Sequence, residues 1–192
     1  MEQIISESLR DSIHAKQLLV NNQLSEIIQL VEEIVGTFRD GRKMLIFGNG
    51  GSAADAQHMA GEFVNRFIIE RDPLPAIALT TDTSILTCIG NDVSFDDIFV
   101  KQVQALGKPG DLALGISTSG NSANVLKAIG MARNLGLKTA ALTGGTGGKL
   151  IDLADTVINV PVDQTPYIQE AHLWVEHLVC RLVDEKLFGS LK

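Results

Sequence analysis

Four hydroxyl side chains lie close together in one short turn, Ser117, Thr118, Ser119 and Ser122. They stand between an apolar run typical of a buried strand and a segment with helical periodicity. Such a turn directs backbone N–H groups and the positive end of the helix dipole at one point, to which hydroxyls also donate. Ordinary N-capping would account for one or two of these hydroxyls, but not for four. The turn therefore predicts an anion site, and a phosphate suits it.

Two predicted helices carry groups that could bind a metal or move protons. His58 and Glu62 are four residues apart, so they share one helix face at a distance of about 6 Å. Gln169 and His177 share a line on the last helix, whereas His172 lies off it and is expected to be structural or exposed. Nitrogen and oxygen ligands of this kind suit zinc or a related divalent ion. Because Gln169 and His177 are about 12 Å apart along the helix, they either lean together onto one ion or serve sites in different subunits.

Two glycine-rich segments resemble nucleotide-binding motifs. Residues 48–53 fit the dinucleotide fingerprint, but Asp82 stands too late in the chain to be the usual ribose-binding acid. Residues 144–149 resemble a P-loop, yet Leu150 occupies the place of the magnesium-binding hydroxyl, so we expect only a flexible loop there. The first segment also repeats the order of the hydroxyl turn: apolar strand, small polar turn, helix. Two similar turns could therefore face one ligand.

Strand and helix patterns alternate from residue 43 onward. Apolar runs predict strands at 44–47, 76–79, 112–116, 139–142 and 157–160, and periodicity predicts helices from 52, at 84–89, 96–106, 122–135 and 166–187. This alternation indicates an α/β fold with a parallel sheet, helices on both faces and ligands at the carboxyl ends of the strands.

The first forty residues read as two amphipathic helices placed before the first strand. The second shows one apolar face, formed by Leu24, Ile27, Ile28, Val31, Ile34, Val35 and Phe38. A sister subunit could bury such faces as well as the sheet could, so we expect an oligomer. The length suits a single domain over 1–192, made of a helical pair (1–40) and an α/β core (41–192).

Composition excludes several classes of protein. A net charge of -7 disfavours direct nucleic-acid binding, which needs clustered Lys and Arg. No segment resembles a membrane span or a signal peptide, so we expect no membrane association and a cytoplasmic location. Cys88 and Cys180 are isolated and are expected to act as small buried hydrophobes.

Taken together, these residues make the chain similar to the sugar isomerase (SIS) family of phosphosugar-binding domains and, within it, to the sedoheptulose 7-phosphate isomerases. The resemblance covers nearly the whole chain and rests on residues 48–52, His58 with Glu62, residues 90–92, residues 115–122, and residues 168–172 with His177. It implies a flavodoxin-like three-layer sandwich with five parallel strands, a homotetramer with active sites at subunit interfaces, and one zinc ion per subunit. It also implies the interconversion of sedoheptulose 7-phosphate and D-glycero-D-manno-heptose 7-phosphate, the first step toward nucleotide-activated heptose for bacterial surface glycans.

The resemblance also assigns roles to residues. Ser117, Thr118, Ser119 and Ser122 would hold the phosphate, and the rest of the substrate would contact Asn49, Gly50, Gly51, Ser52, Glu62, Asn91, Asp92 and Gln169. Glu62 and His177 would move protons, and with His58 and Gln169 they would hold the metal. A metal on Glu62 would lower its basicity, so its roles as base and ligand compete. Tyr167 stands where relatives often carry Arg, and Arg66 could supply positive charge instead.

A second function class shares this fold. Some members bind a phosphosugar as a signal or act as tetrameric adaptors for replication initiators, and residues 52–58 and 74–79 are close to those adaptors. The adaptors lack the acid and base, whereas Glu62 and His177 are present here, so the enzyme is favoured. An isomerase for another sugar phosphate remains the nearer alternative.

Overall fold

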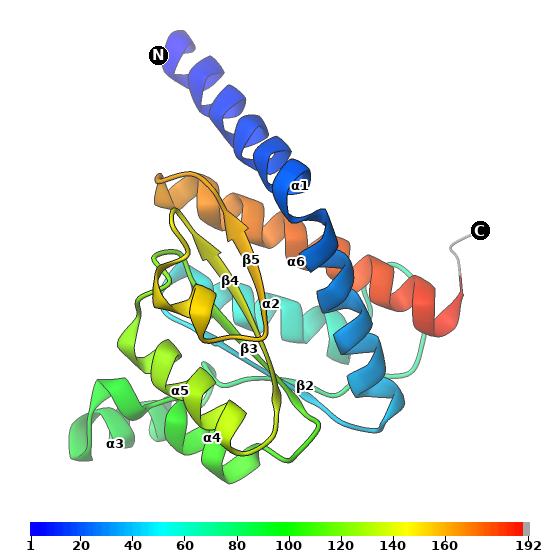
Figure 1. Ribbon diagram of the computed structural model, residues 1–192, viewed down its shortest axis with the longest axis vertical. Coiled ribbons are helices and arrows are strands. Elements are labelled where there is room, and N and C mark those ends of the chain that lie inside the picture. Colours follow the sequence, from blue (N-terminus) through cyan, green and yellow to red (C-terminus); the bar gives the residue numbers. More distant parts are fainter. Residues whose placement is uncertain (190–192) are drawn as a thin grey trace.

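The core of the protein is a five-stranded parallel sheet with helices on both faces, seen in a computed structural model that describes residues 1–189 (Figure 1). The strands are β1 (Met44–Gly48), β2 (Ala76–Ala78), β3 (Leu112–Ser117), β4 (Lys138–Gly144) and β5 (Thr156–Val160), in the spatial order β2-β1-β3-β4-β5. β1 and β3 are buried along their whole length, as expected of continuous apolar strands covered on both faces. The predicted α/β class and parallel sheet are confirmed.

The helices form two layers around this sheet (Figure 1). One face packs against α1 (Glu2–Arg39), α2 (Gly51–Val64) and α6 (Thr165–Phe188), and the other against α4 (Val100–Leu106) and α5 (Ala123–Asn134), beside which α3 (Thr83–Asp92) lies. Consequently α2 leaves β1 toward one face, while α5 leaves the neighbouring β3 toward the other. This is the topological switch point at which flavodoxin-like sheets open a ligand crevice.

The N-terminal segment, α1, consists of two helical halves joined at a kink, in keeping with the expected helical pair. Gln23 has non-helical backbone angles (φ -131°, ψ 20°), and this kink divides α1 into two halves. The second half packs on the sheet, although Leu24 and Ile28 of the expected apolar face are exposed. The first half projects beyond the core (Figure 1). Its apolar side chains Ile4, Ile5 and Leu9 are exposed.

Three local expectations differ from the structure. The predicted helix at 96–106 is divided into a 3₁₀ turn, η1 (Phe95–Asp97), and the short helix α4. Cys88 is exposed, because α3 has no fully buried residue, whereas Cys180 is buried as expected. The glycine-rich segment after β4 is not a free loop, since it continues into a second 3₁₀ helix, η2 (Gly148–Asp152), and packs against the hydroxyl turn.

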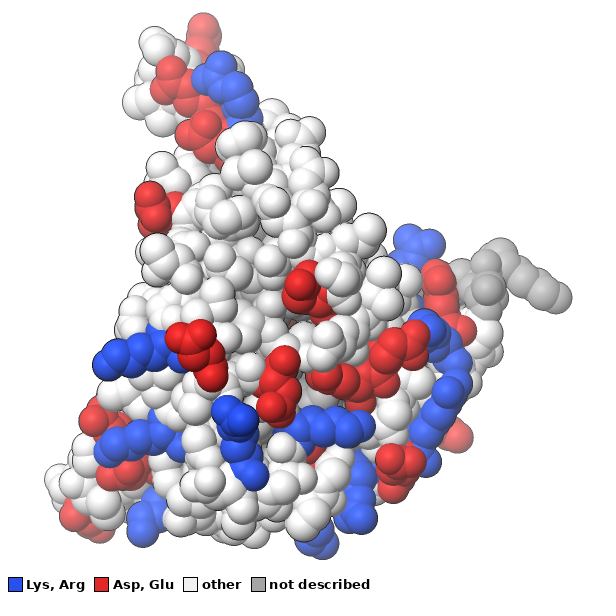
Figure 2. Space-filling model, in the orientation of Figure 1, with Lys and Arg blue, Asp and Glu red and all other residues white. Residues whose placement is uncertain are grey.

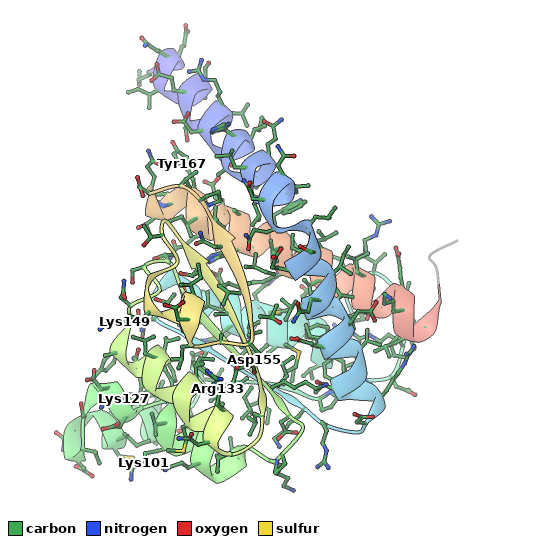
Figure 3. All side chains as sticks on the ribbon, viewed as in Figure 1. Lys101, Lys127, Arg133, Lys149, Asp155 and Tyr167 are labelled. Atoms are coloured by element: carbon green, nitrogen blue, oxygen red, sulfur yellow. The ribbon has the colours of Figure 1, made fainter. Side chains whose placement is uncertain are left out.

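The surface agrees with the composition. On the face shown in Figure 2, acidic and basic side chains of residues 1–189 alternate around the lower half without a continuous basic stripe. Lys127 pairs with Asp97 at 3.2 Å, and Arg133 approaches Asp155 at 3.9 Å, so these cations, labelled in Figure 3, face nearby carboxylates. None of the helices within residues 1–189 is both long and apolar enough to cross a membrane.

Candidate active site

The hydroxyl turn lies at the carboxyl end of β3, in the centre of the sheet. Ser122 occupies the N-cap position of α5, yet its side chain makes no capping hydrogen bond. Its Oγ instead lies 2.9 Å from Oγ of Ser117, the last residue of β3. The first-turn N–H groups of α5 therefore lack a side-chain cap and remain able to bind an anion. This geometry removes the ordinary capping explanation for Ser122.

A cavity of about 270 Å³ opens beside this turn. It lies between the ends of β3 and β4 and the start of α6, and its lining is Thr118, Ser119, Gly144, Gly145, Thr146, Asp163, Thr165 and Ile168. The hydroxyls of Thr146 and Thr165 were not anticipated, since they come from separate segments that only the fold brings together. The cavity adds two hydroxyl donors to the predicted anion site at the hydroxyl turn, and it adds one carboxylate, Asp163.

The hydroxyl turn packs closely against the backbone of the glycine-rich segment that follows β4. Gly120 has a left-handed φ of +64°, and a Cβ built there would lie 1.9 Å from the carbonyl oxygen of Gly147. Asn121 bridges the two segments, because its Nδ2 donates to Ser119 O at 2.9 Å and its Oδ1 accepts from Lys149 N at 3.2 Å. The glycines after β4 thus permit the close approach that orders the hydroxyl turn.

The second polar turn follows β1 and lies next to the first. Gly48 is in register with Ile116, so the two turns end neighbouring strands, as their similar sequences suggested. Gly51 begins α2, and a Cβ there would lie 2.5 Å from Nε2 of Gln169, which shows how closely the α6 side chain approaches this turn. Asn49 forms two hydrogen bonds with Asn124, of 2.8 and 2.9 Å. Both turns therefore face the crevice at the switch point.

The acid and base candidates meet further along α2 and α6. His58, Glu62 and His177 each offer a ligand atom, and these atoms lie within 4.8 Å of one another. Nε2 of His58 is 2.7 Å from Nε2 of His177 and 3.5 Å from Oε1 of Glu62. The ring of Phe67 stacks on His177 with centroids 5.4 Å apart. Two imidazoles and a carboxylate suit zinc, so this chain's residues fit the expected ion.

Gln169 does not join this cluster within one chain. Its amide lies against Gly51, while His58 and His177 lie seven and eight residues further along their helices. At 1.5 Å per residue, this is a separation of about 11 Å. Of the two arrangements left open by the sequence, the place of Gln169 beside Gly51 favours sites shared between subunits. A role for Gln169 as a metal ligand would need another copy of the chain.

Two acids near the cluster were not singled out by the sequence: Asp55, which is half-buried, and Glu176, which is buried. Burial raises the pKa of Asp55 to about 6, with the nearby His58 acting in the opposite direction. Burial, together with the charge of Asp55, also raises the pKa of Glu176, and among residues 1–189 neither oxygen of this carboxyl group has a hydrogen-bond partner. His172 is fully buried beside Thr143 O at 2.9 Å, and burial lowers its pKa to about 4. It is structural, as its position off the line of Gln169 and His177 indicated. Asp55 could have been noticed, because it stands one helical turn before His58.

The remaining predicted residues lie in several places. Gly50 is the N-cap of α2, and Ser52 is buried in its first turn. Asn91 and Asp92 end α3, are exposed, and hydrogen-bond to each other at 2.7 Å. Tyr167, labelled in Figure 3, lies on the first turn of α6 and packs against the core, while Arg66 pairs with Glu70 at 2.9 Å.

Known proteins resemble the chain in sequence and in fold. A family model described as the SIS domain matches residues 9–144. The chain belongs to the SIS domain family. A phosphoheptose isomerase of Aneurinibacillus thermoaerophilus is 47% identical over 194 residues, covering 99% of this SIS protein and 97% of that relative.

Solved structures show the same fold. A phosphoheptose isomerase from Neisseria gonorrhoeae aligns with a TM-score of 0.90 at 43% identity, covering 96% of this SIS chain and 98% of that one. One from Francisella tularensis aligns with a TM-score of 0.92 at 41% identity, covering 95% and 97%. The predicted family and its flavodoxin-like fold are confirmed, and the non-catalytic adaptor is not favoured.

Proposed function

We propose that this protein interconverts sedoheptulose 7-phosphate and D-glycero-D-manno-heptose 7-phosphate. The observation that carries the proposal is the cluster of His58, Glu62 and His177 in the same chain as an uncapped hydroxyl turn. An isomerase needs both features, a group that holds the phosphate and groups that move protons. The proteins named phosphoheptose isomerase that resemble the chain over nearly its whole length support the choice of substrate.

The distances favour a long substrate. Ile168 lines the phosphate cavity, and His177 lies nine residues later on the same helix. The axial separation is therefore about 13 Å, which the inward reach of side chains shortens. A seven-carbon sugar can place its phosphate at the hydroxyl turn and its first two carbons near His58, Glu62 and His177. A triose phosphate is too short to reach both. Asn49, the backbone of Gly50 and Gly51, Ser52 and Gln169 would contact the chain between, with Asn91 and Asp92 as further sugar contacts.

Chemically, aldose–ketose exchange moves one proton between adjacent carbons. Glu62 removes the proton from C1 of the ketose, giving an enediol, and returns it to C2. His177 transfers a proton between the two oxygens, because imidazole can both donate and accept near neutral pH. Phe67 restricts the ring of His177 by stacking on it. The rigid positions of these side chains lower the barrier by holding the reacting atoms in place.

His58, Glu62 and His177 would hold one Zn²⁺ per subunit, with Gln169 of a neighbouring copy as a further ligand. Such an ion supplies Lewis-acid polarisation of the carbonyl and hydroxyl oxygens. Elemental analysis of untagged protein measures it, and His58→Ala is expected to remove the ion. Less than a tenth of an equivalent per wild-type chain would refute the zinc assignment.

We also propose a homotetramer with active sites at the interfaces between copies, working in the cytoplasm at the first step toward nucleotide-activated heptose. The support for assembly is the projecting half of α1, where Ile4, Ile5, Leu9 and Ile13 are 48–69% exposed. Such a helix face needs a covering surface. Light scattering coupled to size-exclusion chromatography measures the mass of the assembly in solution. A monomer at micromolar concentration would contradict the homotetramer.

A coupled or chromatographic assay on ketose phosphates of five to seven carbons tests the reaction. Turnover is expected for the seven-carbon substrate, and Glu62→Gln and His177→Ala are expected to abolish it while the oligomer remains intact. Lys101→Ala, at an exposed position of α4, is the control variant and should keep the activity of the wild type. Full activity in both site variants would refute the roles of Glu62 and His177, and preference for a shorter sugar would refute the substrate.

A further inference from the structure

A pair of asparagines joins the two polar turns across the crevice. Nδ2 of Asn49 donates to Oδ1 of Asn124 at 2.8 Å, and Nδ2 of Asn124 donates to Oδ1 of Asn49 at 2.9 Å. Asn49 stands in the turn after β1, and Asn124 is the second residue of α5, after β3. The pair therefore links segments that belong to different connections of the sheet.

The location of this pair is the switch point itself. α2 and α5 begin at adjacent strand ends and then pack on opposite faces of the sheet, so the two helices do not pack against each other. Neither helix has a side-chain cap on its first turn. The reciprocal amide pair is the side-chain hydrogen bond that ties these two N-termini together within residues 1–189. The pair thus adds a side-chain link to the backbone pairing of β1 and β3, which ends at Gly48 and Ile116.

Burial separates the roles of the two residues. Asn124 is only 2% exposed, so a ligand in the crevice cannot reach it. Asn49 is half-buried and keeps a second N–H and a second lone pair, since a side-chain amide has two donors and an acceptor oxygen with two lone pairs. Asn124 thus orients the plane of the Asn49 amide, and Asn49 itself lines a small cavity beside its own turn together with Gly48 and Gly50.

We propose that Asn124 is a positioning residue for phosphosugar binding. It acts through Asn49, fixing the turn of residues 48–51 against the hydroxyl turn so that both present their donors to one ligand. This inference rests on the proposed isomerase function for its substrate. The asparagine pair itself is independent of that choice.

Steady-state kinetics with sedoheptulose 7-phosphate test the proposal in wild type, Asn124→Ala, Asn49→Ala and the double variant. Asn124→Ala is expected to raise KM roughly tenfold, the size of losing one oriented hydrogen bond, while kcat changes far less. In the Asn49→Ala background, Asn124→Ala is expected to change KM by less than about twofold, because its partner is already gone. Multiplying losses in the double variant would overturn the proposal.

Thr139→Val is the matched control. Thr139 is also fully buried, its hydroxyl donates to Asp155 at 2.6 Å, and it lies at the opposite end of the sheet. It should lower the thermal midpoint without changing KM. If Asn124→Ala does not fold, Asn124→Ser keeps a polar group in this buried place but is too short to restore both bonds. An unchanged KM in the folded variant contradicts the positioning role.

Hydrogen exchange provides a readout that does not need turnover. In Asn124→Ala, amides of residues 48–53 are expected to exchange faster, whereas Thr139→Val leaves them unchanged. Unchanged exchange there would refute the inference even if the wild type is active. If the wild type does not convert the seven-carbon substrate, the function fails and the exchange result alone decides the role of Asn124.

Discussion

Removing Arg71 should test how the last turn of α2, which carries Glu62, is held in place. The guanidinium of Arg71 is 1% exposed and lies 2.9 Å from Oδ1 of Asp184 on α6. Its two terminal nitrogens also donate to the backbone oxygens of Glu62 at 2.8 Å and Phe63 at 2.7 Å. One side chain therefore closes the end of α2 and ties it to the helix that carries His177.

The size of the effect follows from the burial of both partners. Arg71→Ala leaves Asp184, whose side chain is 4% exposed, as a buried carboxylate without its cation. Loss of one partner of a buried pair costs about 3–5 kcal/mol. For a chain of this length, 1 kcal/mol shifts the midpoint by about 2–4 °C, so the midpoint should fall by about 6–20 °C. Replacing both residues, as Arg71→Met with Asp184→Leu, should recover much of this loss because no buried charge remains.

Calorimetry or thermal unfolding followed by circular dichroism measures both variants. Assays well below both midpoints should also show a lower kcat for Arg71→Ala, because the backbone of Glu62 loses its anchor. A loss of less than 1 kcal/mol in the single variant, or an equal loss in the double variant, would show that the ion pair does not determine the stability of this helix end.

Three further substitutions probe the site. Asp55→Asn should raise the thermal midpoint above pH 6 but not below pH 4. Burial raises the pKa of this carboxyl group in the folded chain to about 6 from its ordinary value of 3.8, so its ionisation between these pH values destabilises the fold. Equal gains at both pH values would contradict this. Ser122→Ala should weaken the binding of inorganic phosphate in calorimetric titrations and lower the free energy of unfolding only slightly, because Ser122 makes no capping hydrogen bond. A fall in the free energy of unfolding of about 1 kcal/mol, the usual cost of a missing cap, would identify Ser122 as an ordinary N-cap instead. Gly51→Ala should raise KM, because the added Cβ would displace the side chain of Gln169. Gly61→Ala on the same helix is the control, since a Cβ there meets nothing within 4 Å and should leave KM unchanged. The same KM in both variants would remove Gln169 from the substrate contacts.

Sequence patterns predicted those features that depend on local periodicity. The strands appeared as apolar runs because a parallel sheet is buried on both faces, and each predicted strand lies within two residues of its observed bounds. Cys88 was misjudged because periodicity cannot tell that α3 lies beside the sheet without burying any residue fully.

The side-chain pairs that support the site could not be predicted in this way, because their members are distant in the chain, even though Asn49 itself was an expected substrate contact. Asn49 and Asn124 are 75 positions apart, and Arg71 and Asp184 are 113 apart. Only the fold shows what these side chains bind: the asparagine pair joins turns that lead into helices on opposite faces, whereas Arg71 and Asp184 join the end of α2 to α6 on the same face. The hydroxyl turn and His58 with Glu62 were visible because their spacing itself places them on one turn or one helix face.

The crossover arrangement of the sheet also has a consequence for folding. The site draws on residues 48–62, 117–124 and 163–177, so it is complete only when α6, the last helix, has docked. Contacts between such distant segments close long loops, which slows folding relative to proteins with local contacts. A phosphosugar binds only the chain in which all three segments have assembled, and at a hundredfold excess over Kd it would add about 2.7 kcal/mol to the stability of that state. The substrate would thus act as a folding ligand, protecting the last helix from detachment and proteolysis in proportion to its concentration.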